Sequence, residues 1–189
     1  TASFAGGPRH SRSLVVRRSQ RPPIHRRQAP LRQRIHLLPM NNQQTKKILI
    51  LNGPNLNMLG VREPSIYGHQ TLADIKTLCE DAARRLNFSM DFRQSNHEGE
   101  IVTWIQEERL NICGLVINAG AYTHTSLAIH DALKLLDVPI IEVHLSDPST
   151  REEFRHFSYI SSVATNIIKG KGGAGYRDAI ESLSTLVKT

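Results

Sequence analysis

Residues 48–68 read ILILNGPNLNMLGVREPSIYG. The apolar run at 48–51 is typical of a buried strand, which the following Asn-Gly-Pro-Asn ends. About sixteen residues then precede the next helical pattern, whereas strand-to-helix connections commonly have about 2–6 residues. This long connection carries one guanidinium, Arg62, and one phenol, Tyr67, between two glycines. Long loops at strand ends often carry function, so we expect a lid over a site.

From Lys46 onward, short β-branched runs alternate with helical patterns, which predicts a parallel sheet with helices on both faces. Thr71 and Asp74 form a capping box that should begin the first helix. A further short helix is expected from Ser149, with Arg151 and Arg155 on one face. The expected strands are 48–51, 89–93, 114–117, 139–143 and 164–169, and the expected helices are 72–86, 98–110, 126–136 and 176–187. This pattern favours an α/β, flavodoxin-like three-layer fold with strand order 2-1-3-4-5.

The first part of the chain differs in composition from the rest. Residues 1–39 contain nine Arg and no Lys, Asp or Glu, so we expect them to be disordered. Because the whole chain has a formal charge of +7, residues 40–189 carry −2, and the pI of about 9.8 reflects the tail. A folded part that is not basic argues against nucleic-acid binding. We divide the chain into a basic extension, residues 1–45, and a single candidate catalytic domain, residues 46–189.

The basic extension leaves several interpretations open. It is either a non-native leader, with Met40 as the natural first residue, or an Arg-rich organelle transit segment, and nucleic-acid binding through the tail is a third option. It lacks the apolar core of a secretory signal, and no apolar stretch is long enough to span a membrane. Cys79 and Cys113 lie far apart without ligand spacing, so we expect reduced thiols and a cytoplasmic location.

Ligands of such sheets bind outside the carboxyl ends of the strands. The segments there are polar and should converge: 52–55, 118–126 and 142–146. Glu142 and His144 are two apart in a strand, so their side chains point to the same side and the carboxylate can orient the imidazole. This favours a general acid at His144 over a histidine that only ends a strand.

Three further polar residues surround a Gly-containing turn ahead of a helix: Asn118, His124 and Ser126. Short polar groups there can hold hydroxyls or a carboxylate, although Ser126 can equally be only a helix N-cap. Arg155 can bind an acidic ligand, but its spacing from Glu152 favours an ion pair on the surface of the chain.

Two patterns are rejected as cofactor sites. Residues 170–175 match GxGxxG, but the fourteen residues that follow are too few for a dinucleotide site, so we expect a strand-to-helix turn. His124 and His130 are six apart without a carboxylate at ligand spacing, and no P-loop is present. We therefore expect neither a metal site nor a dinucleotide site.

Five segments together resemble the type II 3-dehydroquinate dehydratase family, from about Lys46 to the C-terminus. They are NGPNLNMLGVREPSIYG at 52–68, QSNHEGEI at 94–101, INAGAYTHTS at 117–126, IEVHLS at 141–146 and REEFRHFSY at 151–159. The resemblance implies a cofactor-free lyase that converts 3-dehydroquinate to 3-dehydroshikimate by anti elimination through an enolate, in shikimate synthesis or quinate breakdown. It also implies a homododecamer of four trimers.

The same resemblance implies residue roles. Tyr67 corresponds to the base, and because a free phenol has a pKa of about 10, it needs a nearby cation, for which Arg62 is the candidate. Asn55 corresponds to the residue that stabilises the enolate oxygen through a water, and His144, oriented by Glu142, to the acid that protonates the departing hydroxyl. The implied substrate contacts are Asn118, His124 and Arg155 for hydroxyls, the backbone N–H groups of Leu145 and Ser146 for the carboxylate, and Asp131 from an adjacent subunit.

The chain departs from the family pattern at two places beside the site. Asp-Pro-Ser-Thr stands at 147–150 instead of the more usual Asn-Val-His-Ala, and Gly-Gly-Ala at 172–174 alters the final turn. The competing class is a non-enzymatic flavodoxin-like small-molecule-binding module. Such a module would need a Ser/Thr/Gly-rich phosphate loop after the first strand, where this chain has Asn-Gly-Pro-Asn.

Overall fold

The computed structural model describes residues 45–61 and 69–187. All of them belong to one unit of the chain, residues 42–189. The predicted lid residues Arg62 and Tyr67 lie outside the described residues. Among the helices described, none has the length and apolar character needed to cross a membrane.

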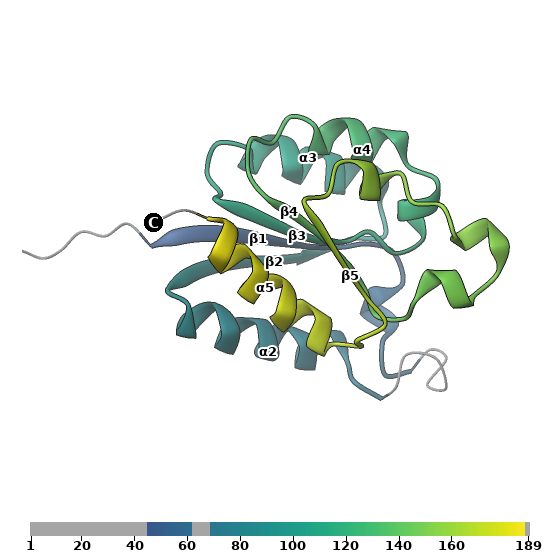
Figure 1. The fold of residues 1–189 in the computed structure, drawn as a ribbon, viewed down its shortest axis with the longest axis horizontal. Helices are drawn as coiled ribbons and strands as arrows, with labels where there is room; N and C mark the ends of the chain where they lie inside the picture. The colour runs from purple at the N-terminus through teal and green to yellow at the C-terminus, as the bar shows by residue number, and fades with distance from the viewer. Residues whose placement is uncertain (1–44, 62–68, 188–189) are drawn as a thin grey trace, which may run out of the picture. The chain divides into compact units, whose positions relative to one another are not determined.

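Five parallel strands form a single sheet in the order β2-β1-β3-β4-β5, which confirms the predicted flavodoxin-like topology (Figure 1). The strands are β1 Lys46–Asn52, β2 Phe88–Gln94, β3 Gly114–Asn118, β4 Ile140–His144 and β5 Asn166–Lys169. Strand β4 ends one residue later than predicted, so His144 is its last residue, and β5 starts two residues later.

Helices cover both faces of the sheet, α2 and α5 on one face and α3 and α4 on the other (Figure 1). They span α2 Leu72–Arg85, α3 Glu98–Glu108, α4 Leu127–Leu133 and α5 Ala174–Leu186. The predicted capping box of α2 is confirmed, because the Thr71 hydroxyl accepts from the Asp74 N–H and the Asp74 carboxylate accepts from the Thr71 N–H. Helix α4 is shorter than predicted and starts after Ser126, which caps it.

The central strand β1 shows why the sequence forms three layers. Its four apolar residues are fully buried, with Ile48 and Ile50 on the face that α2 and α5 cover and Leu49 and Leu51 on the opposite face. A strand buried on both faces must be apolar at every position, and each such side chain contributes about 1.5–3 kcal/mol on burial.

The short helix predicted from Ser149 is wrong. Two separate 3-10 turns, η3 Pro148–Thr150 and η4 Glu153–Arg155, take its place, with extended backbone at Arg151 and Glu152 between them. The Asp147 carboxylate accepts from the backbone N–H of Ser149, and the Asp147 carbonyl accepts from the Thr150 hydroxyl. These bonds cap the start of η3, and the extended backbone at Arg151 and Glu152 then separates η3 from η4.

The glycine-rich segment 170–175 is a strand-to-helix turn, as predicted. It joins β5 to α5, and Gly170 and Gly172 have φ of 74° and 54°, a region that glycine occupies without steric cost.

Candidate active site

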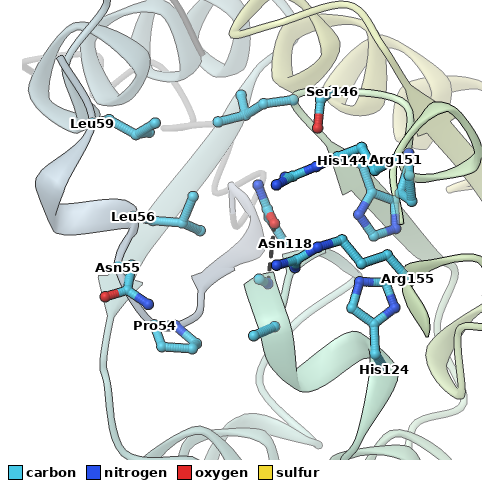
Figure 2. Close-up of a pocket in the computed structure, with 14 residues that line it drawn as sticks. Pro54, Asn55, Leu56, Leu59, Asn118, His124, His144, Ser146, Arg151 and Arg155 are labelled. Carbon is cyan, nitrogen blue, oxygen red and sulfur yellow. Dashed lines mark hydrogen bonds between the residues drawn. The ribbon is translucent and has the colours of Figure 1, made fainter. Parts of the chain in front are cut away.

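One pocket lies outside the carboxyl ends of β1, β3 and β4, where the three polar segments converge as the sequence predicts (Figure 2). In Figure 2 the loop after β1 forms one wall, and the end of β4 with the turns that follow it forms the opposite wall. The lining residues are Pro54, Asn55, Leu56 and Leu59 after β1, Asn118, Gly120, Ala121 and His124 after β3, and His144, Leu145, Ser146, Pro148, Arg151 and Arg155 after β4.

The described candidate residues fall into three groups. Seven line the pocket: Asn55, Asn118, His124, His144, Leu145, Ser146 and Arg155. Glu142 lies behind His144 and is fully buried. Asp131 lies on α4 with a side chain that is 74% exposed, accepts from His130 and does not line the pocket, while Arg62 and Tyr67 lie outside the described residues.

The carboxylate of Glu142 is held by a cage of hydroxyl groups. Thr123 and Ser158 donate to its Oε1 over 2.6 and 2.7 Å, and Ser161 donates to Oε2. Burial by itself would raise the pKa of Glu142, but the hydrogen bonds from His144, Ser161 and Thr123 outweigh it and lower the pKa to about 2. Glu142 is therefore ionised at neutral pH, and the stability this adds is lost as the pH falls from the usual glutamate pKa toward 2.

The ionised carboxylate sets the tautomer of His144. The Nε2 atom of His144 lies 2.9 Å from Glu142 Oε1, and because a carboxylate only accepts, Nε2 carries a hydrogen. The other ring nitrogen, Nδ1, is then the one that can exchange a proton with a ligand in the pocket. The predicted placement of both side chains on one side of the strand is confirmed, and it gives a positioned acid–base group.

The imidazole of His124 carries its hydrogen on the other ring nitrogen. Its Nδ1 lies 2.7 Å from the carbonyl oxygen of Phe157, which fixes a hydrogen on Nδ1. Burial lowers the pKa of His124, and its electrostatic interactions with His144 and Arg155 lower it further, against opposing effects from the Phe157 carbonyl and Glu142. A neutral His124 presents its Nε2 lone pair as an acceptor, which suits a ligand hydroxyl.

Asn55 lines the pocket from a loop with a left-handed backbone conformation. Asn55 has a left-handed φ of 66°, and its N–H donates to Asn96 Oδ1 over 2.9 Å. Next to it, Gly53 lies so close to the Ala119 carbonyl that a Cβ would come within 2.1 Å of the oxygen. Only glycine permits this approach, which brings the loops after β1 and β3 together.

Two guanidinium groups line the wall formed after β4. Arg155 Nε donates to Glu152 over 2.8 Å, so the surface ion pair favoured by the sequence is present, although Arg155 also lines the pocket. Arg151 lines it as well, with its Nε 3.6 Å from the same carboxylate. These two cations favour an anionic ligand.

Sequence reasoning assigned no role to several residues that build the site: Thr123, Ser158, Ser161, Asn96 and Arg151. The signal for them was weak, because single hydroxyl and amide residues are common in loops. Over residues 45–61 and 69–187, no cluster of three His, Cys, Asp or Glu side chains could hold a metal ion.

The fold and the pocket define an α/β protein with a histidine–carboxylate pair and two arginines at a pocket outside the strand ends. Residues 46–184 match the family model described as dehydroquinase class II, and the chain belongs to this family. The resemblance inferred from the five sequence segments is therefore confirmed, and the family places the chain among the lyases.

Individual relatives agree with the family assignment. The chain is 53% identical over 144 residues to 3-dehydroquinate dehydratase of Phenylobacterium zucineum, covering 76% of this chain and 99% of the relative. It is 55% identical over 143 residues to 3-dehydroquinate dehydratase of Streptomyces avermitilis, covering 75% and 90%. The crystal structure of type II dehydroquinase from Propionibacterium acnes matches with a TM-score of 0.72 at 43% identity, over 74% of this chain and 97% of that one.

Proposed function

We propose that this chain removes water from 3-dehydroquinate to give 3-dehydroshikimate, in shikimate synthesis or quinate breakdown, at the pocket outside β1, β3 and β4. The observation that carries the proposal is the caged Glu142 carboxylate bonded to His144 at the pocket. A buried, ionised group is costly and is commonly retained where it serves chemistry. A non-enzymatic binding module would not need it, and that alternative is not favoured.

The chemistry is a stepwise anti elimination. Tyr67, as tyrosinate favoured by Arg62, takes the proton from the carbon beside the ketone, and the electron pair of that C–H bond moves to the carbonyl oxygen as an enolate. Asn55 stabilises the enolate oxygen through a water. The enolate then re-forms the carbonyl and expels the β-hydroxyl, which leaves as water with a proton from His144 Nδ1. Ionised Glu142 holds the imidazole of His144 through Nε2, which leaves Nδ1 for this step.

The remaining pocket residues hold the substrate. His124 accepts from a substrate hydroxyl through Nε2, while Asn118 and Arg155 contact hydroxyls and the backbone N–H groups of Leu145 and Ser146 hold the carboxylate. Asp131 reaches the site of an adjacent subunit, in a homododecamer of four trimers. The exposure of its side chain supports this assignment.

The first test is an absorbance assay for the conjugated enone product, with no metal or cofactor added. We expect turnover of 3-dehydroquinate that survives dialysis against EDTA and treatment with borohydride plus substrate, because no metal or Schiff-base lysine takes part. Unchanged activity after both treatments would support the elimination described above. Loss of activity after borohydride would indicate a lysine-dependent mechanism, and no enone at all would refute the proposed function.

We propose that residues 46–189 are the catalytic domain and that residues 1–45 are dispensable for catalysis. A chain that starts at Met40 should keep kcat within about twofold and the same oligomeric mass, because all the site candidates follow Lys46. Activity and light scattering of the two chains, side by side, measure this. A tenfold lower kcat or a dissociated oligomer would contradict the domain boundary.

The proposed location is the cytoplasm. Both cysteines, Cys79 and Cys113, are free thiols in the structure, which suits a reducing compartment.

A further inference from the structure

The floor of the pocket is connected to helix α5 through a buried tyrosine. Tyr176 is fully buried and does not line the pocket. Its hydroxyl donates to Asn52 Oδ1 over 2.6 Å and accepts from Asn118 Nδ2 over 3.0 Å. Asn118, in contrast, lines the pocket and is 3% exposed. The hydroxyl of Tyr176 thus joins the side chain of Asn52 at the end of β1 to that of Asn118, a pocket residue at the end of β3.

These bonds belong to a series that runs from the Arg93 carbonyl through three side chains to the Gly120 N–H. The two backbone groups at its ends fix the direction of every hydrogen bond in the series. The carbonyl of Arg93 can only accept, so Asn52 donates to it through Nδ2 over 2.9 Å and turns Oδ1 toward Tyr176. Tyr176 has one proton, which it gives to Asn52, and its oxygen must accept from Asn118 Nδ2. At the far end, the N–H of Gly120 can only donate, and it donates to Asn118 Oδ1 over 3.2 Å. A single orientation of the side-chain amides of Asn52 and Asn118 therefore satisfies all of these hydrogen bonds.

A phenylalanine would fill the same space without burying a hydroxyl. Burying an O–H costs free energy unless it is hydrogen-bonded, and each neighbouring amide would also need another partner without it. Burial raises the pKa of the Tyr176 phenol above its usual value, so the hydroxyl stays protonated and can keep donating. Apolar packing alone therefore does not account for the hydroxyl.

We propose that Tyr176 is a positioning residue for substrate binding, which fixes the side-chain amide of Asn118 in the orientation that the pocket uses. With one N–H given to Tyr176 and one Oδ1 lone pair given to Gly120, Asn118 keeps one N–H and one lone pair for a ligand hydroxyl. This inference rests on the proposed function of the pocket. Neither Tyr176 nor Asn52 lines the pocket, so both act through Asn118.

The test is the steady-state kinetics of Tyr176→Phe with 3-dehydroquinate. We expect KM to rise about threefold to tenfold, the effect of weakening one oriented hydrogen bond, with kcat changed less than about threefold. Ile180→Val is the matched control, because Ile180 is buried on the same helix and its truncation loosens the core without touching the amides. The control should lower Tm and leave KM unchanged. An unchanged KM in Tyr176→Phe would overturn the inference.

A second variant changes the residue that accepts the hydrogen bond from Tyr176. Asn52→Ala removes the acceptor of the Tyr176 proton, so the hydroxyl is no longer held with a lone pair toward Asn118 Nδ2, and the Gly120 N–H alone still orients the amide. KM should rise in this variant as well, and it serves as the test if Tyr176→Phe does not fold. Asn52→Ala with wild-type KM would overturn the inference on its own.

A double mutant separates positioning through Asn118 from an independent effect. Asn118→Ala should raise KM, and Tyr176→Phe combined with Asn118→Ala should be no worse than Asn118→Ala alone. If the double variant instead raised KM by the product of the two single effects, Tyr176 would not act through Asn118. An inactive wild-type chain would refute the proposed function together with this inference, whereas an active wild type with unchanged KM in the variants refutes the inference alone.

Discussion

Replacing Tyr67 with phenylalanine is expected to reduce kcat by about 10²–10⁴, with a much smaller change in KM. The substitution removes the hydroxyl that we propose as the base but keeps the aromatic ring. The measurement is the rate of enone formation under saturating substrate. Tyr159→Phe is a matched control that should leave kcat unchanged, because Tyr159 does not line the pocket. Full activity in Tyr67→Phe would rule out the tyrosinate mechanism.

Arg62 is expected to act in the same unit as Tyr67. A phenol with a pKa of about 10 is ionised only slightly at neutral pH, and a nearby guanidinium favours the tyrosinate. Arg62→Ala should therefore lower kcat by a similar factor. If the two residues cooperate, the double variant should be little worse than either single variant, since the effects of cooperating groups are not additive. If the double variant instead lowered kcat by the product of the two single effects, Arg62 would serve another purpose.

His144→Asn is the second substitution with a large expected effect, a fall in kcat of about 10²–10⁴. Asparagine keeps a polar side chain at the end of β4, but it cannot supply a proton to the departing hydroxyl. Because His144 also lines the pocket, a modest change in KM is expected too. His97→Asn is the control, since His97 is exposed outside the pocket and should leave kcat unchanged. Near-normal kcat in His144→Asn would refute its role as the acid.

Glu142→Gln tests how the histidine is held. An ionised carboxylate can only accept from Nε2, whereas a neutral amide can present either its oxygen or its NH2 group to the ring. We expect kcat to fall and KM to change much less, because the amide no longer fixes the hydrogen of the imidazole on Nε2. An unchanged kcat would show that the carboxylate is not needed to hold His144.

Local sequence patterns were sufficient for the fold. The run Ile48 to Leu51 identifies a strand buried on both faces, and Thr71 with Asp74 identifies the start of α2. These features depend on neighbouring residues alone, since strand alternation, helical periodicity and capping are set within a few residues. The pairing of Glu142 with His144 follows from the same kind of reasoning, because alternate residues of a strand share a side.

The segment after β4 shows where local reasoning failed. The spacing of Arg151 and Arg155 predicted one helical face, but extended backbone at Arg151 and Glu152 divides the segment into two turns. Both arginines nevertheless line the pocket, because the tertiary structure brings the turns over the strand ends. Spacing alone could not show whether the two arginines lie on one helix or on two separate turns.

The sequence by itself therefore determined the order of elements, the buried first strand and the placement of Glu142 and His144 on one side of a strand. Only the tertiary structure decided what surrounds that pair: Thr123, Ser158 and Ser161 reach Glu142 from 16 to 19 residues away. Likewise, Tyr176 meets Asn52 across 124 residues of sequence. The physical reason is that single hydroxyl and amide groups have no periodic signature, and their partners are chosen only when packing of the apolar faces brings distant strand ends together.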